Sequence, residues 1–178
     1  MSRIPAEVPK HILVNLGGID KDNVTTHVLN ALQASDLESD CSITVVMGKM
    51  SPWLADVKAR ALNMKYLTRV LVSPENFSLI MSDCDLAIGA CGTTALERCC
   101  IGLPSIVIVV ADNQRYPAMQ MEKVGAAYVI HSMDKVETMT REAIELMIRL
   151  GDLERIKTNC ANLTEGTGAA MTSKILLP

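Results

Sequence analysis

The amino-acid sequence predicts an α/β protein with a doubly wound, Rossmann-like parallel sheet of about six strands. Short apolar runs rich in β-branched residues recur along the chain, and each run is too short to form a helix. Segments with the spacing of amphipathic helices separate these runs, and small or polar residues follow most of their ends. Strands that alternate with helices form βαβ units, which place helices on both faces of a parallel sheet.

The composition is that of a single soluble globular domain. The 178 residues are 49% hydrophobic and 21% charged, with a net charge of -3. This mild negative charge gives no reason to expect nucleic acid or an anionic membrane as a partner. Aromatic residues make up only 3%, which leaves few platforms for stacking bases. No apolar run is long enough to span a bilayer, and Met1 to Lys10 do not have the pattern of a signal peptide.

The cysteines indicate a reducing compartment. None belongs to a Cys-x-x-Cys pair, and most lie within apolar segments. We interpret them as small, reduced core residues of a cytoplasmic protein. The six positions are Cys41, Cys84, Cys91, Cys99, Cys100 and Cys160. We expect neither a metal site nor a cofactor.

The first part of the chain alternates between strand and helix. We expect a strand at His11–Leu16, where an apolar run ends in a Gly-Gly pair, and a helix at Asn23–Ala34, whose apolar residues share one stripe. Ser42–Met47 is rich in β-branched residues and predicts a strand. A helix at Pro52–Met64 places its proline near the first turn.

The central part continues the alternation. Thr68–Val72 predicts a strand and Phe77–Ser82 a short helix. Leu86–Ile88 is a brief apolar run that suits a buried parallel strand. Small residues at 89–92 then allow a tight turn before a helix that Thr93 or Thr94 caps. The remaining segments predict strands at Ile106–Val110 and Ala127–Ile130 and helices at Asn113–Val124, Val136–Leu150 and Asp152–Leu163, with a last helix up to Leu176.

Ligands of such a sheet bind beyond the carboxyl ends of its strands. This rule selects the loops at 17–20, 72–76, 89–94 and 111–114, all of which carry small or polar residues. The Gly-Gly pair of the first loop belongs neither to a full dinucleotide-binding pattern nor to a Walker A loop. It is compatible with an ordinary turn.

The loop at 89–94 is the strongest candidate site. A helix that begins after small residues presents free N–H groups and a positive dipole end, which together bind anions. Glu97 lies one turn into this helix and can accept hydrogen bonds from a ribose diol. The alternative is an ordinary strand-to-helix turn in which Glu97 belongs to a capping box.

The polar loop at 111–114 also has two interpretations. Asp112 or Asn113 can cap the following helix. Asn113 and Gln114 can instead bind sugar hydroxyls or an acetamido group, because a side-chain amide offers two donors and an acceptor.

Several of these stretches together resemble a known group of enzymes. The chain carries, in order, a Gly-Gly loop, Asp-Leu-Ala-Ile-Gly-Ala-x-Gly-Thr-Thr-x-x-Glu-Arg, Gly-Leu-Pro-Ser-Ile-Val, Asn-Gln and Lys-x-Gly-Ala-Ala. This order resembles the C-terminal half of nucleotide-sugar enzymes with the glycosyltransferase-B (GT-B) fold. It is most similar to the UDP-2,4-diacetamido-2,4,6-trideoxy-β-L-altropyranose hydrolases of pseudaminic acid biosynthesis. A more distant similarity is to the N-acetylglucosaminyl transferases that make peptidoglycan lipid II. The resemblance extends from about His11 to the end of the chain and includes the stretch from Glu165 to Ala170, although Met171 stands near where a basic residue is usual.

The resemblance implies a role for each candidate. Glu97 would hold the ribose hydroxyls, and the main chain around Val72 would read the uracil edge, with Pro74 or Asn76 closing the pocket. Asn113 and Gln114 would face the sugar. The implied nucleotide-binding residues are Gly17, Gly18, Val72, Gly92, Thr93, Thr94 and Glu97. The implied partner is UDP or a UDP-sugar.

The resemblance also implies a missing part. The hydrolases take their catalytic base, a histidine, from an N-terminal domain, and we expect that domain to be absent from this chain. The histidines present are His11, His27 and His131, none of which lies in the four loops. Asp20 or Asp112 could act as a base, but neither has an obvious partner.

We therefore expect a linker at residues 1–10 and a nucleotide-sugar-binding domain at 11–178. Three hypotheses remain for its function. The chain is the binding half of a UDP-sugar hydrolase, the donor-binding half of a glycosyltransferase, or a non-catalytic binding module.

Overall fold

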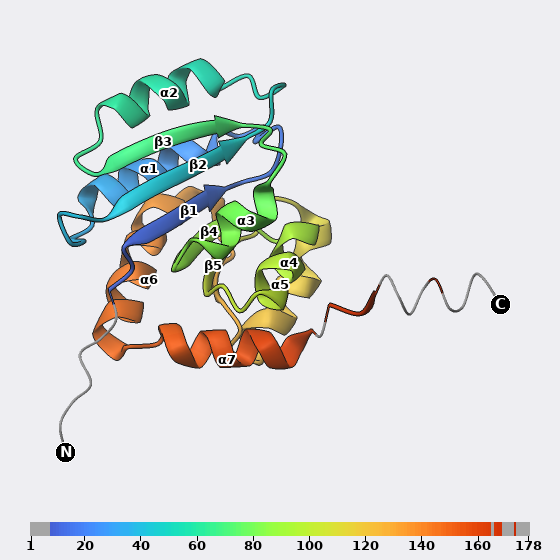
Figure 1. The fold of residues 1–178 in the computed structure, drawn as a ribbon. Helices are drawn as coiled ribbons and strands as arrows, with labels where there is room; N and C mark the ends of the chain where they lie inside the picture. Colours follow the sequence, from blue (N-terminus) through green and yellow to red (C-terminus); the bar gives the residue numbers. More distant parts are fainter. Residues whose placement is uncertain (1–7, 165, 169–172, 174–178) are drawn as a thin grey trace.

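A computed structural model describes residues 8–164, 166–168 and 173. These residues form a six-stranded parallel sheet in the order β3-β2-β1-β4-β5-β6. The strands are β1 (His11–Asn15), β2 (Ser42–Met47), β3 (Leu67–Val72), β4 (Leu86–Ala90), β5 (Ser105–Ile108) and β6 (Tyr128–Ile130). The predicted doubly wound α/β fold is confirmed (Figure 1).

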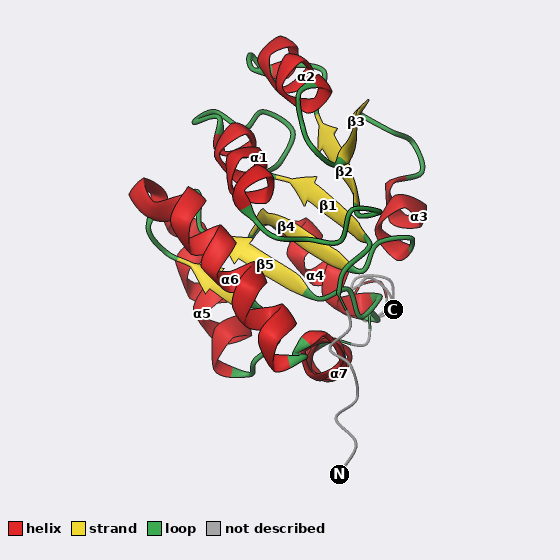
Figure 2. Cartoon of the chain, turned by 90° about the vertical axis from the view of Figure 1, so that its left-hand side faces the viewer, coloured by secondary structure: helices red, strands yellow, loops and turns green. Residues whose placement is uncertain are grey.

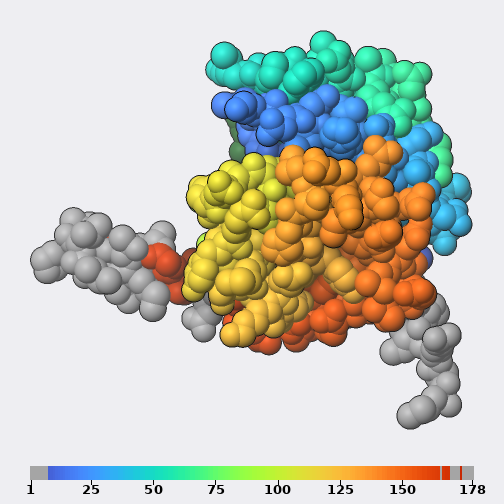
Figure 3. All heavy atoms as spheres, turned by 180° about the vertical axis from the view of Figure 1, so that it is seen from behind, coloured from blue at the N-terminus to red at the C-terminus, as the bar shows by residue number. Residues whose placement is uncertain are grey.

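Helices cover both faces of this sheet. The α-helices are α1 (Val24–Ala34), α2 (Leu54–Leu62), α3 (Phe77–Ser82), α4 (Thr93–Cys100), α5 (Arg115–Lys123), α6 (Val136–Leu150) and α7 (Leu153–Leu163), and the short 3-10 helices are η1 (Asp112–Gln114) and η2 (Met133–Lys135). Helices α1 and α6 pack together on one face, whereas α3 and α4 lie on the other and α7 packs against α4 (Figure 2). From behind, residues of α1, α5 and α6, coloured blue, yellow and orange, form one continuous surface (Figure 3).

The core follows from the position of each strand in the sheet. Every residue of β4 and β5 is buried, as expected for strands that have neighbours on both sides and helices on both faces. The edge strand β3 is exposed or half-buried along its length. Alternate residues of β1 face opposite sides, so that Leu13 packs with Met81 of α3, whereas Ile12 belongs to the cluster that contains Leu29 of α1.

Strand β4 is longer than predicted. The sequence suggests a turn from Gly89, but Gly89 pairs with Asn15 of β1 and with Val107 of β5, and Ala90 pairs with Ile108. Strands on both sides therefore hold Gly89 in extended geometry, and β5 alone does so for Ala90. Helix α2 begins at Leu54, after Pro52.

Other boundaries also differ from the predictions. The predicted helix at Asn113–Val124 divides into η1 and α5. The predicted last helix up to Leu176 and most of the predicted linker lie outside the described residues. No helix within the described ranges has both the length and the apolar character needed to cross a membrane.

Candidate nucleotide site

The candidate site lies where the strand order of the sheet reverses. From β1 the chain proceeds to β2 and β3 in one direction and then crosses to β4 on the other side of β1. The loops that follow β1 and β4 therefore diverge at neighbouring strand ends, which is the position where open α/β sheets bind their ligands. Gly17 and Gly18 follow β1, and Gly92 to Thr94 follow β4, so these predicted residues lie in loops that leave two neighbouring strands at the same edge of the sheet.

The glycine loop after β1 depends on a third glycine. Gly17 has a φ of 95°, which favours glycine, and both Gly17 and Gly18 are exposed. Gly48, directly after β2, lies against the backbone of Gly18, so that a Cβ at position 48 would overlap the Gly18 carbonyl group. We did not identify Gly48 from the sequence. Its place directly after a β-branched strand was the available signal.

Asp20 completes this loop as a helix-capping residue. It is buried with a φ of 48°, and its carboxylate accepts hydrogen bonds from the backbone N–H groups of Val24 (2.9 Å) and Thr25 (3.0 Å). Both carboxylate oxygens are therefore engaged at the start of α1. This arrangement argues against the role of general base that the sequence left open for Asp20.

Helix α4 begins without a capping side chain from any described residue. Its N-cap residue is Gly92, which has extended backbone geometry, and Thr93 and Thr94 are the first two helical residues. The predicted capping by a threonine is therefore wrong. The N–H groups of the first turn remain available, and N–H groups of this kind, together with the helix dipole, can bind an anion.

Glu97 projects from the helical face that carries Thr93. It lies four residues after Thr93, one turn further into α4, and it is exposed. A capping box would require the acidic residue three positions after the N-cap, where the chain has Ala95. The capping-box interpretation of Glu97 is therefore wrong. Its carboxylate is accessible to a ligand that sits on the helix N-terminus.

The loop after β3 is tied to the loop after β2. Val72 aligns with Met47, and the N–H of Ser73 donates to the carbonyl of Met47 (2.9 Å). The hydroxyl of Ser73 accepts a hydrogen bond from the N–H of Lys49 (3.2 Å). Val72 lies three strands away from β4, which corresponds to roughly 14 Å along the sheet edge at the usual strand spacing. This separation is comparable to the length of a nucleoside diphosphate.

Gln114 and Asn113 differ in their surroundings. The side-chain carbonyl of Gln114 accepts a hydrogen bond from the N–H of Val110 (3.1 Å), which holds the loop after β5 closed and leaves the Gln114 amide NH₂ as a donor. Asn113 is exposed and has no side-chain partner within the described part of the chain. Asp112 is exposed and forms an ion pair with Arg115 (2.9 Å), so it stabilises the start of α5.

The histidines lie away from the loops after β1 and β4. His11 is at the amino end of β1, where its ring nitrogens contact the Asp83 carbonyl (2.9 Å) and the Thr44 hydroxyl (2.7 Å). His27 is on α1, and His131 follows β6 and pairs with Glu122 (3.1 Å). The described residues contain no cluster of His, Cys, Asp and Glu side chains that could hold a metal ion.

Arg98 lies against the carboxyl-terminal residues of β4 and is 0% exposed. Its Nη2 atom donates to the carbonyl of Ala90 (3.0 Å), whereas Nε and Nη1 have no partner among the described residues. Burial lowers the pKa of Arg98 to about 10, so the guanidinium remains charged at neutral pH. The sequence analysis assigned this residue no role, although a charged residue beside the apolar position of Cys99 was the available signal.

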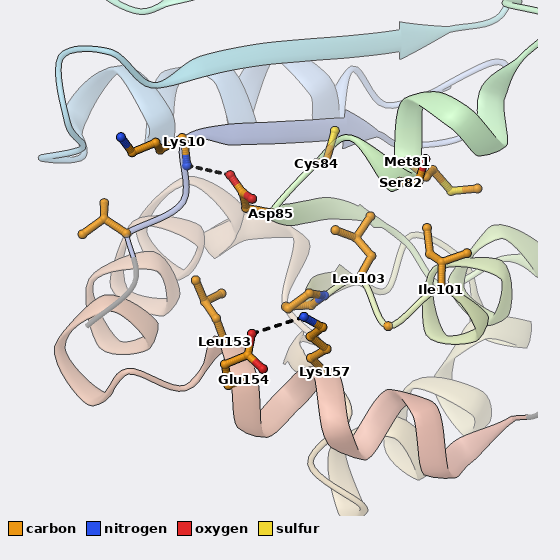
Figure 4. A pocket seen from close by; sticks show the side chains of 13 residues that line it. Lys10, Met81, Ser82, Cys84, Asp85, Ile101, Leu103, Leu153, Glu154 and Lys157 are labelled. Carbon is orange, nitrogen blue, oxygen red and sulfur yellow. Dashed lines mark hydrogen bonds and ion pairs between the residues drawn. The ribbon is translucent and has the colours of Figure 1, made fainter. Parts of the chain in front are cut away.

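A cavity of about 630 Å³ lies at the opposite edge of the sheet (Figure 4). Its lining includes Lys10, Asp85 and Pro104, which precede β1, β4 and β5. The N–H of Lys10 donates to the Asp85 carboxylate across its wall (2.9 Å). Because it is at the amino ends of the strands, this cavity does not contribute to the candidate nucleotide site.

Comparison with known proteins identifies the fold. No family model matches the chain. Among solved structures, Acinetobacter baumannii MurG superposes with a TM-score of 0.80 at 17% identity, covering 96% of this chain and 50% of that one. The spinosyn rhamnosyltransferase SpnG complexed with thymidine diphosphate gives 0.70 at 16% identity, covering 98% and 46%. The pneumococcal O-GlcNAc transferase GtfA in complex with UDP and GlcNAc gives 0.65 at 17% identity, covering 97% and 37%.

The chain has the Rossmann-like domain fold of GT-B glycosyltransferases. It is also 32% identical over 119 residues to the spore coat polysaccharide biosynthesis protein SpsG of Bacillus subtilis (strain 168), covering 66% of this chain and 34% of that protein. The uncharacterized protein MJ1062 of Methanocaldococcus jannaschii is 28% identical over 117 residues, covering 65% and 24%. The matched region thus spans about a third or less of these curated relatives.

Proposed function

We propose that this chain binds the nucleotide of a UDP-sugar in an enzyme of surface-polysaccharide biosynthesis. The uncapped N-terminus of α4, beside the glycine loop at the reversal of strand order, is the observation that carries the proposal. The diphosphate would accept hydrogen bonds from the N–H groups of Gly92, Thr93 and Thr94. Glu97 would accept hydrogen bonds from the ribose diol, and the main chain near Val72 would read the uracil edge.

Two comparisons support this assignment. Solved structures with the same fold are described in complex with UDP or thymidine diphosphate, and the relative SpsG is described as a spore coat polysaccharide biosynthesis protein. More narrowly, we propose a UDP-sugar hydrolase of pseudaminic acid or related biosynthesis, whose base comes from an N-terminal domain. Asn113 and the free amide NH₂ of Gln114 would then face the sugar. The glycosyltransferase fold favours a second candidate, the donor-binding domain of a transferase.

Calorimetry with the chain tests the binding function. UDP should bind weakly, and Glu97→Ala should weaken UDP binding by about 1–3 kcal/mol, the scale of a hydrogen bond to a charged group. Inorganic pyrophosphate, which has no ribose, should bind the wild type and Glu97→Ala equally. Equal affinity of the wild type for UDP and pyrophosphate would contradict the ribose role of Glu97.

An activity assay separates the two candidate enzymes. The described loops contain no convincing base, and general acid–base catalysis is typically worth about 10²–10⁴-fold, so the chain should release UDP from a 2,4-diacetamido UDP-sugar only slightly above background. Addition of an N-terminal domain from a UDP-sugar hydrolase should restore release to water. Release that requires an added sugar acceptor would identify a transferase, and full activity of residues 1–178 alone would contradict the missing base.

A further inference from the structure

Arg98 is a buried cation for which the described residues provide no buried carboxylate as a counter-ion. The ionisable groups that act on its pKa are the thiols of Cys99, Cys91 and Cys160 and the exposed carboxylate of Glu97. Cys160 donates its S–H group to the carbonyl of Ala126 (3.1 Å), as a neutral thiol does. A buried charge without a counter-ion is costly, because its hydration is lost and little replaces it. The position of this guanidinium therefore requires an explanation.

The guanidinium occupies a space that the last residues of β4 keep open for it. A Cβ on Gly89 would overlap Nη1 of Arg98 and would lie 2.6 Å from the carbonyl oxygen of Asn15. Gly89 and Asn15 are paired residues of β4 and β1, the two strands at the reversal of strand order. Nη2 holds the carbonyl of Ala90, two residues before the N-cap of α4. The charge thus lies directly beneath the turn that presents the free N–H groups.

We propose that Arg98 is a positioning residue that fixes the turn before α4 and supplies a buried positive charge beneath the diphosphate of the bound nucleotide. This inference rests on the proposed UDP-binding function. The guanidinium would act mainly through its field, because it is fully buried and the surrounding low dielectric weakens its screening. Its hydrogen bond to Ala90 would keep the N–H groups of Gly92 and Thr93 directed at the phosphates.

Ligands that differ only in phosphate charge test this role. UDP and uridine are titrated into the wild type, Arg98→Met and Arg98→Lys, with binding followed by NMR so that weak uridine binding is measurable. Arg98→Met keeps much of the volume and removes the charge, so UDP affinity should fall about tenfold or more while uridine affinity stays the same. Arg98→Lys keeps the charge and should retain a UDP-to-uridine affinity ratio within about threefold of the wild type.

The control variant Glu97→Ala should show the opposite pattern, with UDP and uridine weakened by the same factor. An unchanged UDP-to-uridine ratio in folded Arg98→Met would overturn the role of Arg98. If Arg98→Met does not fold, a tenfold loss of that ratio in Arg98→Lys would overturn it instead. Failure of the wild type to bind either ligand would reject the proposed function itself, and with it this inference.

Discussion

The backbone of Gly18 occupies the space that a side chain on Gly48 would need, because a Cβ at position 48 would overlap the carbonyl group of Gly18. This contact joins the loops after β1 and β2, which come from segments thirty residues apart in the sequence. By contrast, a Cβ on Gly18 itself would meet nothing within 4 Å. The two glycines therefore serve different purposes. Gly48 allows the loop after β1 to pack closely against the loop after β2, and Gly18 leaves the solvent side of the loop after β1 open to a ligand.

Substitution of these two glycines should distinguish an effect on protein stability from an effect on ligand binding. Gly48→Ala should destabilise the protein by about 1–3 kcal/mol, because the backbone of Gly18 must move, and it should also weaken UDP binding. Gly18→Ala should change the unfolding free energy by less than about 0.5 kcal/mol but weaken UDP binding, because its methyl group would occupy ligand space. Urea denaturation and calorimetry measure the two effects. Equal destabilisation by both variants would contradict this contact.

Gln114 should contribute to both stability and catalysis, and Asn113 to catalysis alone. Gln114→Ala removes the acceptor for the N–H of Val110 and should cost about 1 kcal/mol of stability. Asn113→Ala should leave stability unchanged. In an assay to which the N-terminal domain of a UDP-sugar hydrolase is added, both should lower UDP-sugar turnover more than UDP affinity, if the proposed function holds. Thermal unfolding and UDP release measure these effects, and a loss of UDP affinity as large as the loss of turnover would contradict the sugar-facing role.

Three hydrogen-bonded polar residues, Tyr128 of β6 with Asp152 and Arg155, should make the stability of the protein depend on pH in both the acid and the alkaline range. Asp152 accepts hydrogen bonds from Arg155 (2.8 Å and 2.9 Å) and from the Tyr128 hydroxyl (2.5 Å). The Arg155 bond lowers the pKa of Asp152 below its ordinary value of 3.8, so its stabilisation is present above that pH and is lost as pH falls further. Burial raises the pKa of Tyr128 to about 12, so its contribution is lost as pH rises from 10 to 12.

Two variants assign these pH effects. Asp152→Asn should lower stability at neutral pH by about 1–3 kcal/mol and flatten the acid side of the profile. Tyr128→Phe should flatten the alkaline side. Urea denaturation at a series of pH values gives both profiles. If the unfolding free energy of Asp152→Asn falls with decreasing pH as steeply as that of the wild type, another carboxylate is responsible for the loss of stability in acid.

Thiol labelling should reveal a single accessible cysteine. The sequence predicts that Cys99 and Cys100 are both core residues, but Cys100 is exposed, because it lies on the outer side of α4, whereas the other five cysteines are buried. Burial raises the pKa of Cys41 to about 11 and of Cys84 to about 12, which further slows their reaction. Ellman's reagent should label one thiol quickly at pH 8. Cys100→Ser should abolish this phase, and its persistence would contradict the assignment.

Local sequence patterns were sufficient for the order and type of the six strands and seven α-helices that the structure describes, but not for the two 3-10 helices. Runs such as Ser42–Met47 and Val136–Leu150 carry their own periodicity, and both have the predicted bounds. Features that depend on distant segments were not predictable in this way. Gly89 becomes a strand residue because it pairs with both β1 and β5, and Ala90 because it pairs with β5. Position 48 must be glycine because the backbone of Gly18 lies against it, and Arg98 can be buried because β4 has no side chain at Gly89.

The candidate site was predictable in its location rather than in its detail. The rule for strand ends placed the loops correctly, because all the strands are parallel and end at one edge. The predicted N-cap of α4 was wrong. Threonine is a common N-cap residue, but in the structure Gly92 has the extended geometry of the N-cap. The ligand roles of Glu97, Asn113 and Gln114 stay predictions.

The uncapped start of α4 has a spectroscopic consequence. Because no described side chain accepts from the first-turn amides, the amide protons of Thr93 and Thr94 should exchange rapidly with solvent deuterium in the free protein. A phosphate that accepts hydrogen bonds from them would slow this exchange and move their nitrogen and proton resonances. The exchange rates and resonances of these two amides would then report how much of the site is occupied by ligand. This measurement needs no labelled ligand and does not depend on cleavage of the sugar.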